Sequence, residues 1–290
     1  MPREIALLTN PTAGKGRGAR ARDAALARLR SVGIAVRSLE GTDPDQALRL
    51  AREQVTAGVD ALVVVGGDGM VNIAAQALAG TDTPLGIIPA GTGNDVARYF
   101  DIPRKDPGTA AERVIAGEVR TIDLARVLDR YYVSVMAAGF DAVVNERANR
   151  MTWPRGQMRY NLATIAELRT FRPLDYVLEL DGNVVHTPAM LVAIGNGPSF
   201  GGGLRIAEGA ILDDGLLDVV VIKPVSKVEL VRTYPKLFKG THVTHPQYEH
   251  HRVRRVTVAA PGIVGYADGE RIGPLPVTVE CVPRALKVLA

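Results

Sequence analysis

Residues 61 to 78, ALVVVGGDGMVNIAAQAL, constrain the fold more than any other stretch of this sequence. Apolar residues run into a Gly-Gly-Asp-Gly turn, and an alanine-rich segment of helical character follows. A strand that passes through a glycine turn into a helix is a building unit of parallel β-sheets. The turn then lies at the carboxyl end of its strand, where open α/β sheets bind ligands.

This alternation of strand and helix continues through about the first 124 residues. Asp43 is a plausible helix cap, Pro44 suits the first turn, and Gly58 suits the end of that helix. The rhythm predicts an α/β domain whose parallel sheet is covered on both faces. Strands are predicted at 4–10, 34–40, 61–67 and 84–89, and helices at 19–29, 43–58, 70–80 and 96–100.

After residue 124 the pattern changes to short β-rich runs separated by Gly, Pro and Asp, most of them without helices between them. Such runs predict a second domain built as an antiparallel β-sandwich. The predicted division is 1–124 and 125–283, with the tail 284–290 packing back on the first domain. Strands are predicted at 131–139, 175–182, 189–197, 216–222, 254–260 and 276–282, and helices at 157–171 and 227–240.

Composition excludes several classes of protein. A net charge of +4 fits an anionic substrate or membrane surface, but with only 5% aromatic residues there is no sign of a nucleic-acid-binding stripe. The single cysteine, Cys281, cannot form an intrachain disulfide, so we expect a reducing cytoplasm. No apolar stretch approaches the length of a spanning helix, so contact with a membrane is expected to be peripheral.

The glycine turn suits a phosphate group. Gly66 and Gly67 lack side chains, so phosphate oxygens can approach their backbone N–H groups, and the helix from about Met70 adds the positive end of its dipole. Asp68 beside a phosphate makes sense if a cation lies between them. Taken alone, the same residues also fit an ordinary connection with Asp68 as helix cap.

Two further loops resemble this one. Thr9–Gly16 follows a predicted strand and carries Thr12 and Lys15, and Gly91–Asp95 follows another. Each loop by itself is compatible with a simple surface connection. Because successive parallel strands end at the same edge of a sheet, three such loops together indicate one phosphate site.

These blocks give the chain a resemblance that spans nearly its whole length. It resembles the diacylglycerol kinase catalytic-domain family, which includes sphingosine and ceramide kinases, and in particular its bacterial soluble lipid kinases. The matching blocks stand in the family's order: NPTAG at 10–14, GGDG at 66–69 with Asn72, GTGND at 91–95, GEVRTIDLARV with Asp123, ILDDGLLDVVV at 211–221 and YADGERI at 266–272.

The resemblance implies an ATP- and Mg²⁺-dependent lipid kinase that phosphorylates the hydroxyl of diacylglycerol to give phosphatidic acid. It implies ATP contacts at two loops and at two further threonines. The residues at the matching positions are Asn10, Pro11, Thr12, Ala13, Gly14, Thr42, Gly66, Gly67, Asp68, Gly69, Met70, Val71, Asn72 and Thr92.

The resemblance also implies catalytic and metal-binding groups. Glu270 matches the family's proton acceptor, while Asp95 and Asp123 match acidic positions tied to magnesium and the active site. A structural magnesium would lie at the Asp214 side chain and the backbone carbonyls of Ile211 and Leu216. We further expect Asp68 to contact the ATP-bound Mg²⁺, and Lys15 and Arg98 to offset charge in the transition state. From the residues alone, ADGE also fits a type I′ hairpin turn, and LDDG a turn before a strand.

Met70 departs from the family, which usually has Thr or Ser there. A thioether is a poor substitute for a hydroxyl at a phosphate oxygen, so we expect altered nucleotide contact at this position while the backbone donors still serve.

For the lipid we expect an apolar pocket between the domains, lined by 137–144, 195–206 and the helix around 160–171. Arginines concentrate in the same region and would face anionic headgroups, although a solvated face explains them equally well. They are Arg147, Arg150, Arg155, Arg159, Arg169 and Arg172. The histidines of 242–251 lack convincing carboxylate partners, so an exposed loop is predicted there.

Other functions remain open at this point. The acceptor is either diacylglycerol, another lipid alcohol (sphingoid or glycerolipid), or a soluble molecule, because NAD kinases share the GGDG loop. A non-catalytic nucleotide-binding regulator is the alternative from another class. We expect a cytoplasmic protein that associates peripherally with the inner face of the membrane, and a homodimer is left open.

Overall fold

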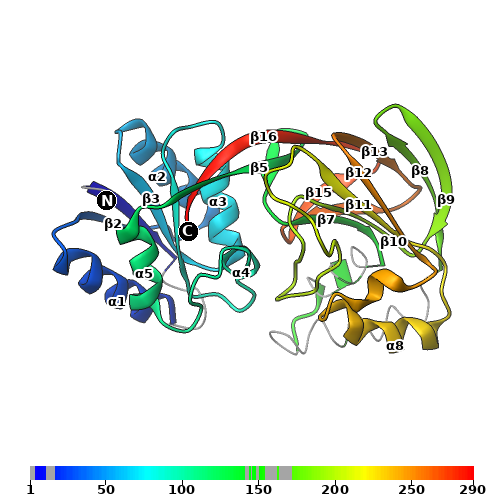
Figure 1. Ribbon diagram of the computed structural model, residues 1–290, viewed down its shortest axis with the longest axis horizontal. Helices are drawn as coiled ribbons and strands as arrows, with labels where there is room; N and C mark the ends of the chain where they lie inside the picture. Colours follow the sequence, from blue (N-terminus) through cyan, green and yellow to red (C-terminus); the bar gives the residue numbers. More distant parts are fainter. Residues whose placement is uncertain are drawn as a thin grey trace. The chain divides into compact units, whose positions relative to one another are not determined.

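The computed structural model describes residues 4–10, 17–140, 144, 146–147, 150–153, 162 and 172–290. The chain divides into two compact units (Figure 1). The first contains residues up to Leu124 together with Leu212–Gly215 and Val282–Ala290. The second contains Ala125–Ile211 and Leu216–Cys281. The tail predicted to join the first domain thus falls inside the first unit.

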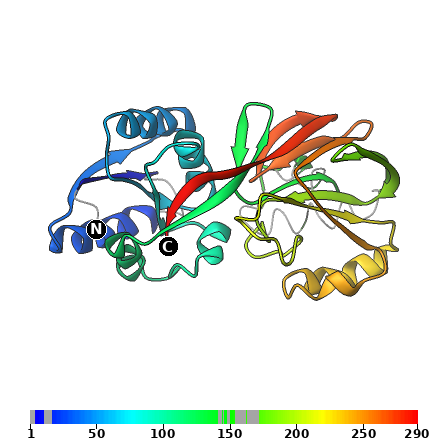
Figure 2. The same ribbon diagram turned by 45° about the horizontal axis from the view of Figure 1, so that its top comes forward.

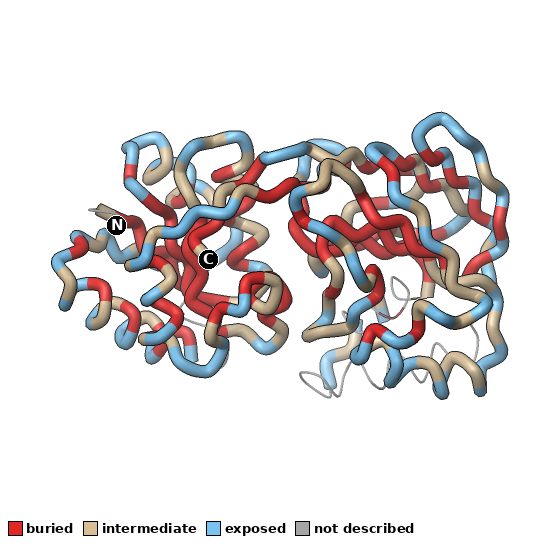
Figure 3. The backbone as a smooth tube through the Cα atoms, in the orientation of Figure 1, coloured by how far each residue is buried: buried red, intermediate tan, exposed pale blue. Residues whose placement is uncertain are grey.

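The first unit is built on a parallel sheet with strand order β2-β1-β3-β4-β16. Its inner strands β3 and β4 are buried throughout, as expected when helices cover both faces of a sheet (Figure 3). This confirms the predicted parallel α/β domain. The strands are β1 (Glu4–Thr9), β2 (Ala35–Glu40), β3 (Ala61–Gly66), β4 (Leu85–Pro89) and the distal part of β16 (Val277–Leu289).

The helices of this unit pack in two layers. Helices α1 and α5 lie together on one face of the sheet, and α2 and α3 lie on the other (Figures 1 and 2). Because alanines fill the buried stripes of these helices, the helices approach the sheet closely. The helices are α1 (Arg17–Ser31), α2 (Pro44–Thr56), α3 (Asp68–Leu78), α4 (Asp95–Tyr99) and α5 (Pro107–Ala116).

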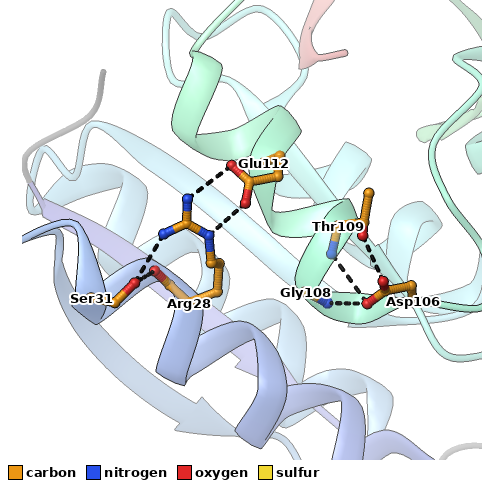
Figure 4. A network of polar contacts seen from close by, with 6 residues as sticks. All are labelled: Arg28, Ser31, Asp106, Gly108, Thr109 and Glu112. Atoms are coloured by element: carbon orange, nitrogen blue, oxygen red, sulfur yellow. Dashed lines mark hydrogen bonds and ion pairs between the residues drawn. The ribbon is translucent and has the colours of Figure 1, made fainter.

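Capping residues define where these helices begin. The Asp43 carboxylate accepts a hydrogen bond from the Gln46 amide at 2.8 Å, which confirms the predicted cap of α2. Helix α5 was not anticipated, although its signals are of the same kind. Asp106 accepts bonds from the amides of Gly108 and Thr109, and Gly117 ends the helix with a φ of 70° (Figure 4).

An ion pair joins the two helices on this face. The guanidinium of Arg28 in α1 forks onto the carboxylate of Glu112 in α5 and also donates to the Ser31 hydroxyl (Figure 4). The hydroxyl and amide of Thr109 lower the pKa of the capping Asp106 carboxyl. These polar contacts lie on the outside of helices whose buried sides are alanine-rich, so they orient α5 rather than form the core.

Two strands carry the chain from one unit to the other. Strand β5 (Val119–Val127) passes from the first unit into the second after Leu124, and β16 returns after Cys281. Inside the first unit the amide of the terminal Ala290 donates to the Glu118 carbonyl at 3.1 Å. The last residues of the chain are therefore part of the α/β unit.

The second unit contains two antiparallel sheets. One is six-stranded with order β12-β11-β10-β7-β14-β15, and the other continues from β16 through β13, β8 and β9. This confirms the predicted antiparallel second domain. The strands new to this unit are β6 (Arg130–Tyr132), β7 (Val135–Gly139), β8 (Leu174–Leu180), β9 (Asn183–Ala189), β10 (Leu191–Gly195), β11 (Leu217–Ile222), β12 (Tyr248–Val253), β13 (Arg255–Ala259), β14 (Val264–Ala267) and β15 (Glu270–Pro274).

A large apolar core lies between these sheets. It combines Leu178 and Val256 of one sheet with Val192 and Val219 of the other. Two buried tyrosines bridge the sheets through hydrogen bonds, since the hydroxyl of Tyr132 donates to the Ile194 carbonyl, and that of Tyr176 to the Ala138 carbonyl. Burial raises the pKa of both phenols, so they remain neutral donors.

Three predictions of secondary structure need comment. The strand predicted at 131–139 is wrong as one element, because the amides of Val133 and Ser134 turn away to the Asp268 carboxylate and divide it into β6 and β7. The helix predicted at 227–240 is confirmed as α8 (Lys227–Leu237). The helix predicted at 157–171 lies almost wholly outside the described residues.

The exposed loop predicted for the histidines of 242–251 is wrong. This segment forms a short 3₁₀ helix, η2 (Thr241–Thr244), and then strand β12. His242 is 2% exposed, and its Nε2 lies 3.2 Å from the Ile206 carbonyl oxygen. Among the described residues, no helix has both the length and the apolar character needed to cross a membrane.

Burial of His242 predicts a dependence of stability on pH. Desolvation lowers the pKa of its imidazole in the folded state, so the unfolded chain binds a proton more readily. The free energy of unfolding is therefore expected to fall as the pH drops below the ordinary histidine value. His242→Gln should flatten this dependence in chemical denaturation curves recorded at several pH values. If the free energy of unfolding changes with pH equally in His242→Gln and in the wild type, this prediction is wrong.

Candidate active site

The loops after β1, β2, β3 and β4 lie along one edge of the parallel sheet. Strand register sets Thr9 beside Val65 and Gly66 beside Pro89, and the amide of Ala90 donates to the Gly66 carbonyl at 2.8 Å. Another bond, from the Gly41 amide to the Thr9 carbonyl, brings in the loop after β2. The described parts of the predicted phosphate loops are thus neighbours within the first unit.

Two of these loops touch backbone to backbone. A Cβ atom placed on Gly91 would lie 2.4 Å from the Cα of Gly67, closer than any real contact. Asn94 holds the second loop in shape: its side-chain amide both accepts from and donates to the backbone of Gly91 at 3.0 Å. Asn94 itself has a φ of 55°, in the left-handed region that Asn tolerates. The glycines are therefore needed for the loops to pack, before any ligand binds.

Helix α3 begins at this edge of the sheet. Gly67 is its N-cap, and the amides of Met70 and Val71 already bond to the Gly67 carbonyl. The preceding amides, those of Asp68 and Gly69, belong to the part of a helix that has no intrahelical acceptor. Gly69 is exposed, so this helix start offers donors and a positive dipole end to an anion.

Three charged residues accompany these donors. An oxygen of the Asp68 carboxylate accepts the Val96 amide at 3.1 Å, which joins the start of α3 to the start of α4. Asp95 is 2% exposed, with the Arg98 Nε 3.7 Å from its Oδ1, and Arg98 also donates to the Gly93 carbonyl. The structure therefore brings Asp68, Asp95 and Arg98 into one cluster with the glycine loops. Because a carboxylate has more acceptor sites than one amide uses, this cluster suits a hard cation.

Met70 points into the interior. It is 5% exposed, and a Cβ on Gly66 would collide with its side chain at 2.4 Å. A long apolar side chain here packs beneath the bare glycine, a role that a hydroxyl would not fill. Val71 is also buried, so neither side chain faces the loop edge. The expected effect of Met70 on nucleotide contact stays a prediction.

The other residues predicted to contact the nucleotide differ in their exposure and in their hydrogen-bond partners. Thr92 is exposed on the loop after β4. Thr42 follows β2, and both its amide and its hydroxyl donate to Gln46 Oε1 at 2.7 Å. Asn72 is half-buried on α3 beside Gln76. Asn10 is half-buried after β1, whereas Pro11, Thr12, Ala13, Gly14 and Lys15 lie outside the described residues.

Asp123 has a role that the sequence did not indicate. It is 1% exposed, and its two carboxylate oxygens accept the amides of Gly215 and Arg284, each at 2.7 Å. Its own amide donates to the Leu212 carbonyl. One buried carboxylate thus ties the 212–215 segment and the returning β16 to the first unit, and its assignment to magnesium stays a prediction.

Replacing Asp123 with Asn is expected to destabilise the first unit. An asparagine NH₂ group would face one of the two N–H donors and leave it unsatisfied, so we expect a loss of about 1–3 kcal/mol in the free energy of unfolding. Chemical denaturation measures this loss, and Asp129→Asn on the surface is the matched control. A variant that loses turnover while keeping full stability would show that Asp123 serves the chemistry alone.

Glu270 and the predicted structural magnesium site occupy other parts of the chain. Glu270 is exposed at the start of β15, after a two-residue turn in which Asp268 and Gly269 have φ values of 48° and 86°. The turn therefore has the predicted type I′ character. The Asp268 carboxylate fixes it to the amides of Val133 and Ser134, between β6 and β7. Asp214 falls in the first unit, and Ile211 and Leu216 in the second. The described residues contain no group of three His, Cys, Asp or Glu side chains placed to hold a metal. The predicted magnesium site has one carboxylate and two backbone carbonyls, so this finding does not test it.

The second unit contains an apolar cavity of about 570 Å³. Phe140 and Val144 line it from the predicted lipid segment 137–144, and Phe200, Leu204 and Ile206 line it from 195–206. The third predicted segment, 160–171, lies almost wholly outside the described residues. The sequence reading missed its remaining walls, which come mainly from α8 and the region around β12, and also from the start of β10 and the end of β11. The signal for them was the amphipathic pattern of 227–240. These further residues include Leu230, Leu237, His242, His245 and Tyr248.

The polar groups of this cavity are few. The Tyr248 hydroxyl is buried without a hydrogen-bond partner among the described residues, and burial raises the pKa of this phenol to about 12. His245 lies 2.9 Å from Glu229 on α8. Thr233, His242 and Gln247 also line the cavity, but most of its walls are aliphatic or aromatic, which suits hydrocarbon with a few polar contacts.

Comparison with known proteins relates each of the two units to a known domain family. Residues 4–127 match the model of the diacylglycerol kinase catalytic domain, and residues 134–290 match the YegS C-terminal NAD kinase beta sandwich-like domain. A Mycobacterium tuberculosis protein named diacylglycerol kinase is 46% identical over 99% of this chain and 94% of its own length. A Bacillus subtilis protein of the same name is 28% identical over 93% of this chain and 90% of its own length.

Solved structures show the same fold. Two Bacillus anthracis str. Sterne structures, one of them described as a diacylglycerol kinase, superpose with TM-scores of 0.80 and 0.76 at 20% identity. Each superposition covers 99% of this chain and 97% of the Bacillus anthracis chain. With a catalytic-domain match over the α/β unit and a 46% identical relative over nearly the whole length, the chain belongs to the diacylglycerol kinase family of lipid kinases.

Proposed function

We propose that this lipid kinase transfers the γ-phosphoryl group of ATP to the hydroxyl of diacylglycerol, forming phosphatidic acid and ADP. The observation that carries the proposal is the packing of Gly67 against Gly91, which gathers backbone donors and the Asp68–Asp95–Arg98 cluster at one sheet edge. Phosphoryl transfer needs mainly positioning and charge neutralisation, and this edge supplies both.

In the proposed reaction each group has one task. The amides at the start of α3 and of residues 92–94 bind phosphate oxygens, and Arg98 offsets negative charge. Mg²⁺, held by Asp68 and Asp95, would neutralise charge on the phosphates. Glu270 accepts the proton of the lipid hydroxyl as that oxygen bonds to the γ-phosphorus and the bond to ADP breaks. Lys15 is proposed to assist Arg98.

The acceptor is proposed from two supports. Relatives across most of the chain are named diacylglycerol kinase. The second unit also has an apolar cavity that would take hydrocarbon tails, with the Tyr248 hydroxyl able to bond an ester oxygen. A soluble acceptor such as NAD has no hydrocarbon tail to bury against these apolar walls.

Contact with an anionic membrane belongs to the same proposal, because the substrate resides there. Of the arginines predicted to face headgroups, Arg147, Arg150 and Arg172 are exposed, and Arg150 lies 3.7 Å from Glu146. Arg155, Arg159 and Arg169 lie outside the described residues. A cytoplasmic protein that visits the inner face of the membrane fits this picture.

A radiolabelled ATP assay that offers diacylglycerol, sphingosine and NAD side by side tests the proposal. We expect Mg²⁺-dependent transfer to diacylglycerol at a rate well above the other two. Preferred transfer to sphingosine would move the acceptor to another lipid alcohol, and transfer to NAD would reject a lipid substrate. ATP binding without transfer to any acceptor would identify a regulator instead of an enzyme.

A further inference from the structure

Helix α8 presents apolar side chains to solvent in an orderly stripe. Val228, Val231, Tyr234 and Phe238 recur at intervals of three and four residues, so they share one side of the helix and its final turn. Their exposed fractions are 60%, 58%, 39% and 44%. All eleven residues of α8 are described, and none of them is buried.

The adjoining side of α8 faces the cavity. Leu230, Thr233 and Leu237 are partly buried and line it, and Glu229 is held by His245. Because Val231 and Tyr234 also reach the cavity wall, a single helix separates the apolar interior from an apolar exterior. A helix in this position is a cover for the cavity.

Basic residues flank the exposed stripe. Lys227, Arg232, Lys236 and Lys239 are all exposed, while the acid of this segment, Glu229, is turned toward His245. An apolar stripe bordered by Lys and Arg is typical of helices that lie in the headgroup region of anionic bilayers. A symmetric contact with a second copy of the chain would instead bring these cations against their own counterparts.

We propose that α8, together with Phe238 and Lys239, docks on an anionic bilayer and inserts its apolar stripe at the entrance of the cavity. Hydrocarbon would then meet apolar side chains continuously from the bilayer, past Val231 and Tyr234, to the cavity walls. This inference rests on the proposed function for the identity of the lipid that enters. The binding of α8 to the membrane surface needs no catalysis.

Vesicle flotation tests the docking directly. The probes are vesicles of phosphatidylcholine alone, or of phosphatidylcholine mixed with phosphatidylglycerol, without diacylglycerol. The test variant is Val228→Asn with Phe238→Asn, two residues that are exposed and do not line the cavity. The matched control is Val177→Asn with Val184→Asn, which alters two exposed apolar residues of the β8–β9 hairpin.

We expect the test variant to bind mixed vesicles about tenfold more weakly than wild type, because it loses the apolar area that would be buried. The control should bind as wild type does. Arg232→Gln with Lys239→Gln should weaken binding to mixed vesicles by about tenfold and have little effect on neutral ones. Circular dichroism and thermal melting confirm that each variant is folded.

Activity on a short-chain diacylglycerol dispersed without vesicles separates the two proposals. If vesicle binding depends on α8 but no lipid is phosphorylated by any form, the docking stands and the proposed function fails. If phosphorylation occurs and the test variant binds vesicles as wild type does, the docking fails alone. The docking is also overturned if the wild type binds neither kind of vesicle. The same holds if ultracentrifugation shows that the variant differs from the wild type only in its oligomeric state.

Discussion

Glu270→Gln is expected to lower turnover by about 10²–10⁴-fold, the usual contribution of a positioned general base. The amide is nearly isosteric with the carboxylate but accepts no proton from the attacking hydroxyl. Because Glu270 is exposed on a hairpin whose turn is clamped by Asp268, the substitution should leave folding intact. Steady-state kinetics with diacylglycerol and ATP measure the loss.

Two controls make this result specific. Affinity for ATP, measured by calorimetry, should be nearly unchanged, since Glu270 is not assigned a nucleotide contact. Glu179→Gln, which alters an exposed glutamate of β8, should keep full turnover. Wild-type turnover in Glu270→Gln would reject Glu270 as the base.

Gly91→Ala is expected to damage both stability and nucleotide binding. Its Cβ would lie 2.4 Å from the Gly67 Cα and 2.9 Å from the Asn94 Oδ1, so the two loops must separate. Forcing an extra carbon into such a contact costs about 1–3 kcal/mol in the free energy of unfolding. Because the loops carry the phosphate donors, ATP affinity should fall by about tenfold or more.

Gly69→Ala is the informative partner of this variant. A Cβ at Gly69 meets no atom within 4 Å, and alanine is the better helix former by about 1 kcal/mol, so stability should hold or rise. Nevertheless, ATP affinity should fall if phosphate lies against this turn, because the methyl group would occupy its space. Unchanged affinity in Gly69→Ala would place the phosphate elsewhere.

Local sequence signals predicted the first unit well. Asp43 and Pro44 define a helix start through bonds within four residues, and the glycines after residue 65 end a strand in the same local way. The same signals at Asp106, Pro107 and Gly117 define α5, which the sequence reading overlooked. Helix α5 is therefore encoded by local capping signals of the same kind as those of α2.

Other features depend on partners far along the chain. The break between β6 and β7 is made by Asp268, which is 135 residues from Val133. His242 is buried because it meets Ile206, and Asp123 accepts amides from Gly215 and Arg284, 92 and 161 residues away. Spacing within a motif carries no information about such long-range contacts. An aspartate in an exposed turn and a buried aspartate that joins distant segments therefore look alike in sequence.

Met70 shows the same limit inside a recognised motif. The family comparison suggested a missing hydroxyl, whereas burial of this side chain against Gly66 shows a packing residue. A motif identifies which loop is present, but the direction of each side chain follows from the fold around it. The walls of the apolar cavity contributed by α8 and the region around β12 were missed for a related reason, since no family motif marks them.

A crystal structure with Mg²⁺ and a non-hydrolysable ATP analogue tests the central claim most directly. We expect the triphosphate to lie on the amides of Gly67–Gly69 and of residues 92–94, with the metal between it and the carboxylates of Asp68 and Asp95. Nucleotide bound at another place in the protein, with this edge of the parallel sheet empty, would contradict it.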